Sequence, residues 1–173
     1  IGAAGMTKKE SRDLVATASI SYATSIQYVI VPKGTFTSAD LENGKLPIAK
    51  LADMAVGAQV GTTGYYLIDD SIALEDGDLY GTESTVKTYK NAIIASQDIG
   101  SMVDAVIIDK LPAQSICNSN SDLECFELDA EPESYVLYLN KEATDLLKDI
   151  NEVLQTLIDE GKIAQYTINH SNS

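Results

Sequence analysis

Histidine and arginine are almost absent from this chain, and their scarcity narrows the chemistry that it can perform. His170, in the C-terminal tail, is the only histidine among 173 residues. A lone histidine in a tail excludes Ser-His-Asp and Cys-His catalysis and metal sites with several histidines. Arg12 is the only arginine, and the other eleven of the twelve basic residues are lysines. Arg12 is either an ordinary surface residue or a group that recognises a carboxylate through two hydrogen bonds.

Positive charge and long apolar runs are also scarce. The formal net charge is −14 and the isoelectric point about 4.2, which disfavours nucleic acids and anionic membranes as partners, because both require basic patches. No apolar run reaches the roughly 18 residues of a membrane span. With 45% hydrophobic residues and a mean hydropathy of −0.04, the 173-residue chain predicts a globular protein of one domain or two small ones.

Cysteine occurs twice, at positions 117 and 125, on either side of a polar segment. The two residues do not form a Cys-x-x-Cys motif, and without histidine they make a poor zinc site. Either Cys117 and Cys125 are free thiols in a reducing compartment, or they form a disulfide that closes a surface loop in an exported protein. We expect the disulfide, because a polar loop gains most from closure.

The segment 56–66 is the first informative stretch. Its first five residues are small or apolar and predict a short buried strand, Gly61 permits a tight turn, and Thr62 is a candidate N-cap for the helix that follows. A strand that turns into a helix in this way directs backbone N–H groups and the positive end of the helix dipole at one point, where an anion can bind. The alternative is an ordinary capped turn.

Strands and helices alternate through most of the remaining chain, which predicts an α/β fold with a mainly parallel sheet. The clearest helix carries an apolar stripe from Ala143 to Ile158, with Asn140 as its expected N-cap and Gly161 as its C-terminal stop. The predicted strands are 27–31, 85–89, 104–108, 126–128 and 135–139, and the predicted helices are 62–73, 90–101, 109–116 and 143–158.

Asp109 follows the strand 104–108 directly. Ligands of open parallel sheets bind at the carboxyl ends of the strands, where Thr62 and Thr63 are also expected. Together with Arg12, these residues provide a cation for a carboxylate and a carboxylate for an ammonium group, which is what recognition of a free amino acid requires. For Asp109 alone, the alternative is a role as the N-cap of the next helix.

Four motifs, in order along the chain, resemble those of extracellular solute-binding proteins for polar amino acids, the ligand-capturing subunits of ABC importers. Gly5-Met6-Thr7-Lys8-Lys9-Glu10-Ser11-Arg12 is similar to the family's Gly-Met-Thr-x-Thr-x-x-Arg. The others are Val56-Gly57-Ala58-Gln59-Val60-Gly61-Thr62-Thr63, Asp104-Ala105-Val106-Ile107-Ile108-Asp109 and the ending Leu154-Gln155-Thr156-Leu157-Ile158-Asp159-Glu160-Gly161.

The resemblance implies a role for each matching residue. Arg12 would bind the ligand α-carboxylate, with help from Thr7 and from backbone N–H groups near Thr62 and Thr63. Asp109 would bind the α-ammonium group. The Gly5 carbonyl would be a further acceptor, and Gln59 would contact the ligand side chain.

The implied fold is a two-lobed α/β fold of the type II periplasmic binding protein kind, with mixed, mainly parallel sheets. Lobe 1 would comprise residues 1–22 and 135–173 and be incomplete at its N-terminal side, and lobe 2 would be complete in residues 23–134. The hinge would lie near residues 23–26 and 133–137. The side chain of the bound amino acid would contact the missing part, so its identity does not follow from these residues.

The implied function is that of a binding protein and not of an enzyme, without a cofactor or a metal. It would deliver a polar amino acid to a membrane permease and an ATPase, outside the cell or in the periplasm, as a lipoprotein made with a signal segment. The alternative is the sensor ectodomain of a signalling receptor with the same fold. Because the apolar stripe 143–158 would lack part of its sheet, we also expect this chain to self-associate.

Overall fold

In the computed structural model, the chain divides into two units joined by two crossings. Unit 2 is the continuous segment Ile26–Glu131, and unit 1 combines Ile1–Ser25 with Pro132–Ser173. The structure describes residues 1–163 and 165–166, so His170 lies outside the described residues. Within the described ranges, no helix is both long enough and apolar enough to cross a bilayer.

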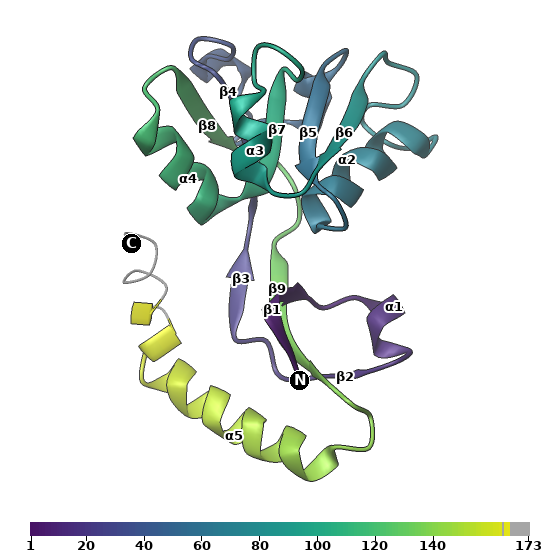
Figure 1. Cartoon of the computed structure of the whole chain (residues 1–173), viewed down its shortest axis with the longest axis vertical. Coiled ribbons are helices and arrows are strands. Elements are labelled where there is room, and N and C mark those ends of the chain that lie inside the picture. Colours follow the sequence, from purple (N-terminus) through teal and green to yellow (C-terminus); the bar gives the residue numbers. More distant parts are fainter. Residues whose placement is uncertain (164, 167–173) are drawn as a thin grey trace. The chain divides into compact units, whose positions relative to one another are not determined.

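Unit 2 is built on a five-stranded mixed sheet in the order β6-β5-β7-β4-β8 (Figure 1). Strand β5 pairs in parallel with β6 and β7, and β4 pairs antiparallel with β7 and β8. The predicted α/β class with mixed sheets is confirmed, but parallel pairing is confined to β5 and its two neighbours. The strands are β4 (Gln27–Pro32), β5 (Ala55–Gln59), β6 (Thr85–Tyr89), β7 (Ala105–Asp109) and β8 (Leu123–Glu127).

Successive side chains of β4 point to opposite faces of this sheet and therefore belong to different parts of the core. Val29 lies in one buried cluster with Ile68 of α2, and Ile30 lies in a second cluster with Ala95 of α3. Helix α2 thus covers one face, and α3 and α4 cover the other. The helices are α2 (Thr63–Ala73), α3 (Ala92–Gln97) and α4 (Lys110–Ser119), with 3₁₀ helices η1 (Ser38–Asp40) and η2 (Ile48–Leu51).

Helix α3 is shorter than the predicted helix over residues 90–101. It begins after Asn91, whose side-chain oxygen accepts a hydrogen bond from the Ile94 backbone N–H at 2.9 Å, and it ends at Gln97. Gly100 then adopts a φ of +81°, a conformation that does not continue a helix. The apolar pattern alone therefore overestimates the length of this helix.

Unit 1 is organised around one strand, β9 (Glu133–Leu139), which pairs antiparallel with all three other strands of its sheet (Figure 1). The sequence predicts residues 23–25 as part of lobe 2, but in the structure this segment is β3, which pairs with β9. The partners of β9 are β1 (Gly2–Thr7), β2 (Thr17–Ala18) and β3 (Ala23–Ser25), and α1 (Glu10–Asp13) connects the first two.

Helix α5 (Thr144–Asp159) confirms the predicted apolar stripe but buries little of it. Leu154 is its only buried residue, at 8% exposure, whereas Leu146 and Val153 are 44% and 58% exposed. The predicted N-cap is wrong: Ala143 occupies the N-cap position, and the Asn140 side chain instead accepts from the Glu142 backbone N–H at 2.9 Å. The predicted stop is confirmed, since Gly161 follows the helix with a φ of +68°.

Candidate functional site

The turn between β5 and α2 has the predicted geometry. Gly61 has a φ of +73°, and the Thr62 hydroxyl caps α2 by accepting from the Tyr65 backbone N–H at 3.3 Å. The same hydroxyl donates to the Gln59 carbonyl at 2.7 Å. Thr62 uses its only hydroxyl proton within this turn. The turn can therefore offer an anion its backbone N–H groups but not this hydroxyl.

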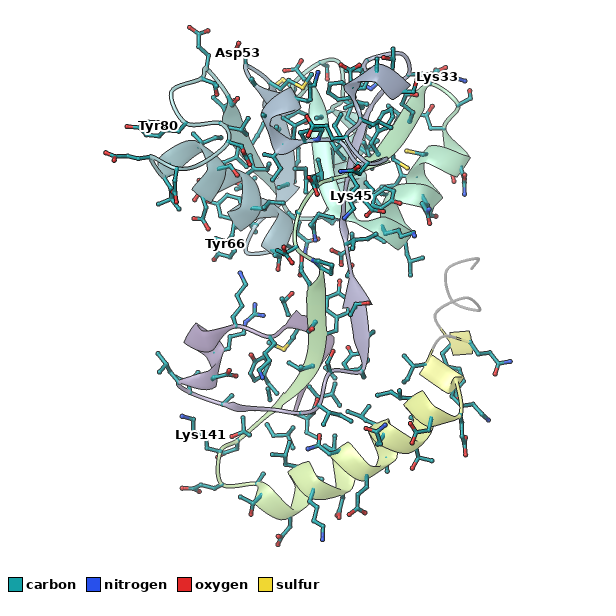
Figure 2. The ribbon with its side chains drawn as sticks, turned by 180° about the vertical axis from the view of Figure 1, so that it is seen from behind. Lys33, Lys45, Asp53, Tyr66, Tyr80 and Lys141 are labelled. Atoms are coloured by element: carbon teal, nitrogen blue, oxygen red, sulfur yellow. The ribbon has the colours of Figure 1, made fainter. Side chains whose placement is uncertain are left out.

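Tyr65 and Tyr66 add an aromatic pair to the first turns of α2. Their ring centroids are 5.1 Å apart and the rings meet at 66°. Tyr66 remains 42% exposed, and its position is labelled in Figure 2. The Tyr-Tyr dipeptide in the sequence signalled the helix but not this edge-to-face contact.

Asp109 ends β7 and does not act as a side-chain N-cap, although α4 begins directly after it. Its Oδ1 instead accepts a hydrogen bond of 2.6 Å from Nε2 of Gln27, a residue that the sequence analysis did not select. The two residues are direct cross-strand partners in the β4–β7 ladder. Asp109 thus occupies the N-cap position of α4, as the alternative expected, but its side chain makes no capping hydrogen bond.

Unit 2 brings the predicted residues Gln59, Thr62, Thr63 and Asp109 to one edge of its sheet. Strands β5 and β7 are parallel neighbours, with Ala58 opposite Ile107, so the residues that follow them leave the sheet on the same side. The edge combines the positive end of the α2 dipole with the Asp109 carboxylate. It can therefore bind groups of opposite charge side by side.

In unit 1, Arg12 lies in the last turn of α1 and donates from Nη1 to the Thr7 carbonyl at 2.7 Å. Two ion pairs of unit 2 join Lys45 to Glu127 and Lys50 to Asp40, and neither includes Arg12. The hydrogen bond to Thr7 thus fixes the position of the Arg12 guanidinium.

The Thr7 hydroxyl donates to Oε2 of Glu133, the first residue of β9. Glu133 is only 7% exposed and was not predicted as part of the site. Since a threonine hydroxyl has one proton, the predicted donation from Thr7 to a ligand carboxylate competes with Glu133 in this structure. Thr7 contributes to the surroundings of Arg12 through its carbonyl instead.

Gly5 interrupts the pairing of β1 with β9, where the register shifts between Gly2 and Met6. Its φ of +58° is a conformation that L-residues rarely adopt. Burial raises the pKa of the nearby Tyr22 hydroxyl, and a hydrogen bond with the Gly5 backbone lowers it in part. Gly5 is therefore a fixed backbone position in unit 1, as a carbonyl acceptor would require.

Cys117 and Cys125 are both free thiols in this structure, and the disulfide between them stays a prediction. The segment between them is not the polar loop that the prediction assumed: Cys117 lies in α4 and Cys125 in β8, and both pack against the second buried cluster. Burial, followed by a hydrogen bond with Cys125, raises the pKa of Cys117 to about 12.

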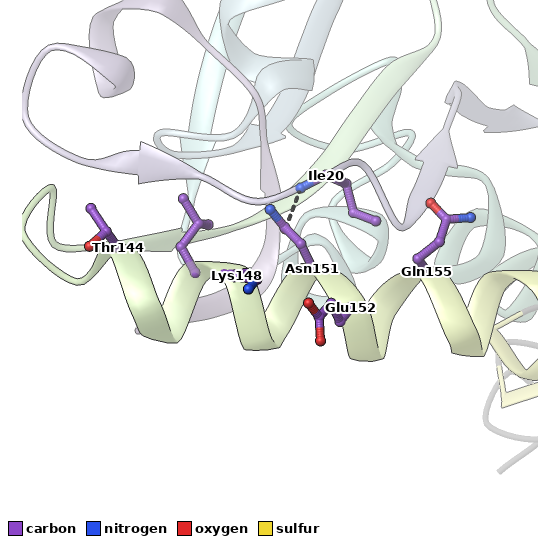
Figure 3. A pocket seen from close by; sticks show the side chains of 7 residues that line it. Ile20, Thr144, Lys148, Asn151, Glu152 and Gln155 are labelled. Atoms are coloured by element: carbon purple, nitrogen blue, oxygen red, sulfur yellow. Dashed lines mark hydrogen bonds between the residues drawn. The ribbon is translucent and has the colours of Figure 1, made fainter.

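The described residues include no metal-binding cluster, and those of unit 1 form a groove. The part of the chain that the structure describes contains no group of three or more histidine, cysteine, aspartate or glutamate residues that could hold a metal ion. In unit 1, a groove of about 460 Å³ is lined by Ile20 and residues of α5. The Ile20 backbone N–H donates to Oδ1 of Asn151 of that helix at 2.9 Å (Figure 3). The lining of the groove includes none of the predicted site residues.

No family model and no curated protein matches the chain, but solved structures do. The amino acid ABC transporter substrate-binding protein AbpA from Streptococcus pneumoniae, bound to L-arginine, is 23% identical, with a TM-score of 0.78 over 97% of this chain and 66% of that one. Holo ArgBP from T. maritima is 29% identical, with a TM-score of 0.66 over 88% of this chain and 61% of that one.

The arginine-, lysine-, histidine-binding protein ArtJ from Geobacillus stearothermophilus is 21% identical, with a TM-score of 0.72 over 93% of this chain and 64% of its own. The structural neighbours are thus amino acid ABC transporter substrate-binding proteins, which confirms the resemblance read from the motifs. The chain has their type II periplasmic binding protein fold and spans 66% of the AbpA chain.

Proposed function

We propose that this chain binds a free amino acid as the substrate-binding component of an ABC importer and catalyses no reaction. The observation that carries the proposal is the distribution of charge: a guanidinium held by a backbone carbonyl in unit 1, Arg12, and a carboxylate held at a strand end in unit 2, Asp109. Solved neighbours bind L-arginine, and an ancestral arginine-binding protein of 24% identity was solved bound to glutamine.

In this proposal, Arg12 binds the ligand α-carboxylate through its planar fork, and backbone N–H groups near Thr62 and Thr63 support the same carboxylate. Thr7 holds Arg12 by its carbonyl, in line with their 2.7 Å hydrogen bond. Asp109 binds the α-ammonium group. The Gly5 carbonyl adds a second acceptor, and Gln59 faces the ligand side chain.

Because Arg12 and Asp109 belong to different units, one zwitterion bound to both groups couples the two units. We propose that the two lobes correspond to unit 1 (Ile1–Ser25 with Pro132–Ser173) and unit 2 (Ile26–Glu131) and move as bodies at hinges where the chain crosses between them. The receiving partners are a membrane permease and its ATPase, and the site of action is the periplasm or the cell exterior, with lipid anchoring of the full-length protein. The named neighbours are binding proteins, and none favours the sensor alternative.

The proposal is tested by titrating the chain with L-arginine and L-glutamine, at concentrations up to millimolar, by calorimetry. Asp109→Asn removes the charge that pairs with the ammonium group and should weaken binding about 10- to 100-fold, since a charge-assisted hydrogen bond contributes about 1.5–3 kcal/mol. Arg12→Lys should weaken it similarly, because an ammonium group lacks the planar fork.

Asp122→Asn is the matched control, because Asp122 is an exposed carboxylate of the same unit. It should leave affinity unchanged. The assignment of Asp109 fails if Asp109→Asn binds every tested amino acid as tightly as the unaltered chain does.

We also propose that the chain self-associates through the apolar face of α5. Leu146 and Val153 are 44% and 58% exposed there, and burial of several such side chains contributes about 1.5–3 kcal/mol each. Sedimentation velocity at micromolar concentration should show a dimer or larger species. Leu146→Glu with Val153→Glu should return it to a monomer, and a monomeric unaltered chain would contradict the proposal.

A further inference from the structure

Gln27 is a buried polar residue to which the proposed function assigns no role. It is 3% exposed and begins β4, a strand enclosed between β7 and β8. Its carbonyl accepts from the Leu128 backbone N–H at 2.9 Å, and its register partner on β7 is Asp109. The backbone of Gln27 is therefore held on both sides by the sheet, so its side chain starts from a fixed position.

One end of the Gln27 amide contacts Asp109. Nε2 donates to Oδ1 of Asp109 at 2.6 Å, a short hydrogen bond to a carboxylate. Such a bond restricts rotation of the carboxylate and so determines the direction in which its oxygens face a ligand. An ammonium group is sensitive to that direction, because its three N–H bonds point along defined axes.

The other end of the same amide contacts the first turn of α2. A Cβ added to Gly64 would lie 2.7 Å from Oε1 of Gln27 and 2.7 Å from Cγ2 of Ile107, closer than Cβ atoms come to other atoms. Glycine at position 64 therefore allows α2 to lie directly against Gln27. One buried amide touches both the Asp109 carboxylate and the helix turn that carries Thr62 and Thr63.

We propose that Gln27 is a positioning residue for recognition of the α-ammonium group: its amide orients Asp109 and sets Asp109 at a fixed distance from the N-terminus of α2. The inference rests on the proposed function of amino acid binding. Loss of the Gln27 amide should lower the affinity for ligands that carry an α-ammonium group and leave the affinity for ligands without one unchanged.

The experiment compares two probes by NMR titration of the full chain: L-arginine and 5-guanidinopentanoic acid, which lacks only the α-amino group. Gln27→Met keeps the length and much of the packing of the side chain but removes its hydrogen bonds. We expect affinity for L-arginine to fall about tenfold and affinity for the analogue to change less than twofold. Gln97→Met, at an exposed position of α3, is the matched control and should change neither.

A second variant covers the case in which Gln27→Met does not fold. Gln27→Leu also removes both hydrogen-bonding groups of the side chain and adds no charge beside Asp109, so it should also lower the ratio of L-arginine affinity to analogue affinity. The proposal is overturned if the ratio of the two affinities is unchanged. An equal loss of both affinities indicates a purely structural role. If the unaltered chain binds neither L-arginine nor L-glutamine, the proposed function itself fails and the role of Gln27 with it.

Discussion

The two units differ in what holds them together. Both buried apolar clusters consist of unit 2 side chains, which fill the two faces of its sheet. Among the described residues of unit 1, the buried apolar side chains are Val136, Tyr138, Leu139 and Leu154, three of them on β9. Packing therefore stabilises unit 2, whereas unit 1 depends on the hydrogen bonds that its segments make to one strand.

Specific side-chain bonds in unit 1 support this difference. The Ser19 hydroxyl accepts from the Leu137 backbone N–H at 2.9 Å, and the Ser19 backbone N–H donates to the Leu137 carbonyl at 2.8 Å. The Tyr138 hydroxyl accepts from the Lys9 backbone N–H at 3.0 Å and fixes the start of α1. Polar contacts of this kind contribute only about 0.5–1.5 kcal/mol each, so unit 1 is the less stable part.

The largest expected effect comes from deleting buried apolar atoms in each unit. Ile68 of α2 is fully buried at 0% exposure, and Leu154 of α5 is the most buried residue of its helix at 8%. Ile68→Ala should lower the free energy of unfolding by about 2–5 kcal/mol, because it leaves an enclosed cavity. Leu154→Ala should lower it by about 1 kcal/mol, since water can occupy the space that it leaves.

Urea unfolding followed by circular dichroism measures both effects. Equal losses for the two variants would mean that α5 is packed as tightly as the core of unit 2.

Helix capping provides a second comparison, with a smaller effect. The Thr62 side chain caps α2, whereas α5 begins without a side-chain cap. Thr62→Ala should lower stability by about 1 kcal/mol, and Thr62→Ser should restore most of it because serine retains the hydroxyl. Thr144→Ala, in the first turn of α5, should change stability by less than about 0.5 kcal/mol. If Thr144→Ala lowered the free energy of unfolding as much as Thr62→Ala does, the two helices would not differ in side-chain capping.

The smallest expected effect is a pH dependence that comes from Asp40 of unit 2. A hydrogen bond from the Thr37 backbone, followed by one from Lys50, lowers the pKa of Asp40 from 3.8 to about 2. Because this pKa is lower in the folded chain, the resulting stabilisation is complete above about pH 4 and is lost as the pH falls through 2. Asp40→Asn should reduce the decrease in urea midpoint between pH 5 and pH 2.5, and Asp122→Asn should not.

The parts of the site that could be predicted are those whose geometry is local. The Gly61 turn and the Thr62 cap depend on residues within four positions of each other, and the structure shows both. The bonds of Asp109 and Thr7 could not be predicted, because their partners, Gln27 and Glu133, are 82 and 126 residues away. Strand register brings those partners together, and no local pattern in the sequence encodes it.

Two predictions of helix boundaries are wrong, for different physical reasons. The spacing of Asn140 from the stripe suggested a cap, but the chain makes a further turn there and α5 starts after Ala143. The polar residues after Cys117 suggested a loop, but α4 continues to Ser119 because its apolar face packs on the sheet. A local turn decided the first boundary, and tertiary packing decided the second.

The position of β9 determines the order in which the chain can assemble. Every strand of unit 2 is complete by residue 127, whereas all strand pairs of unit 1 join residues 2–25 to residues 133–139. A ribosome that synthesises the chain from its N-terminus therefore releases a whole unit 2 sheet before unit 1 can form any strand pair. Until then residues 2–25 lack β9, the strand with which they pair in the structure, and closing the loop between residues 25 and 133 adds an entropic barrier to the formation of this sheet.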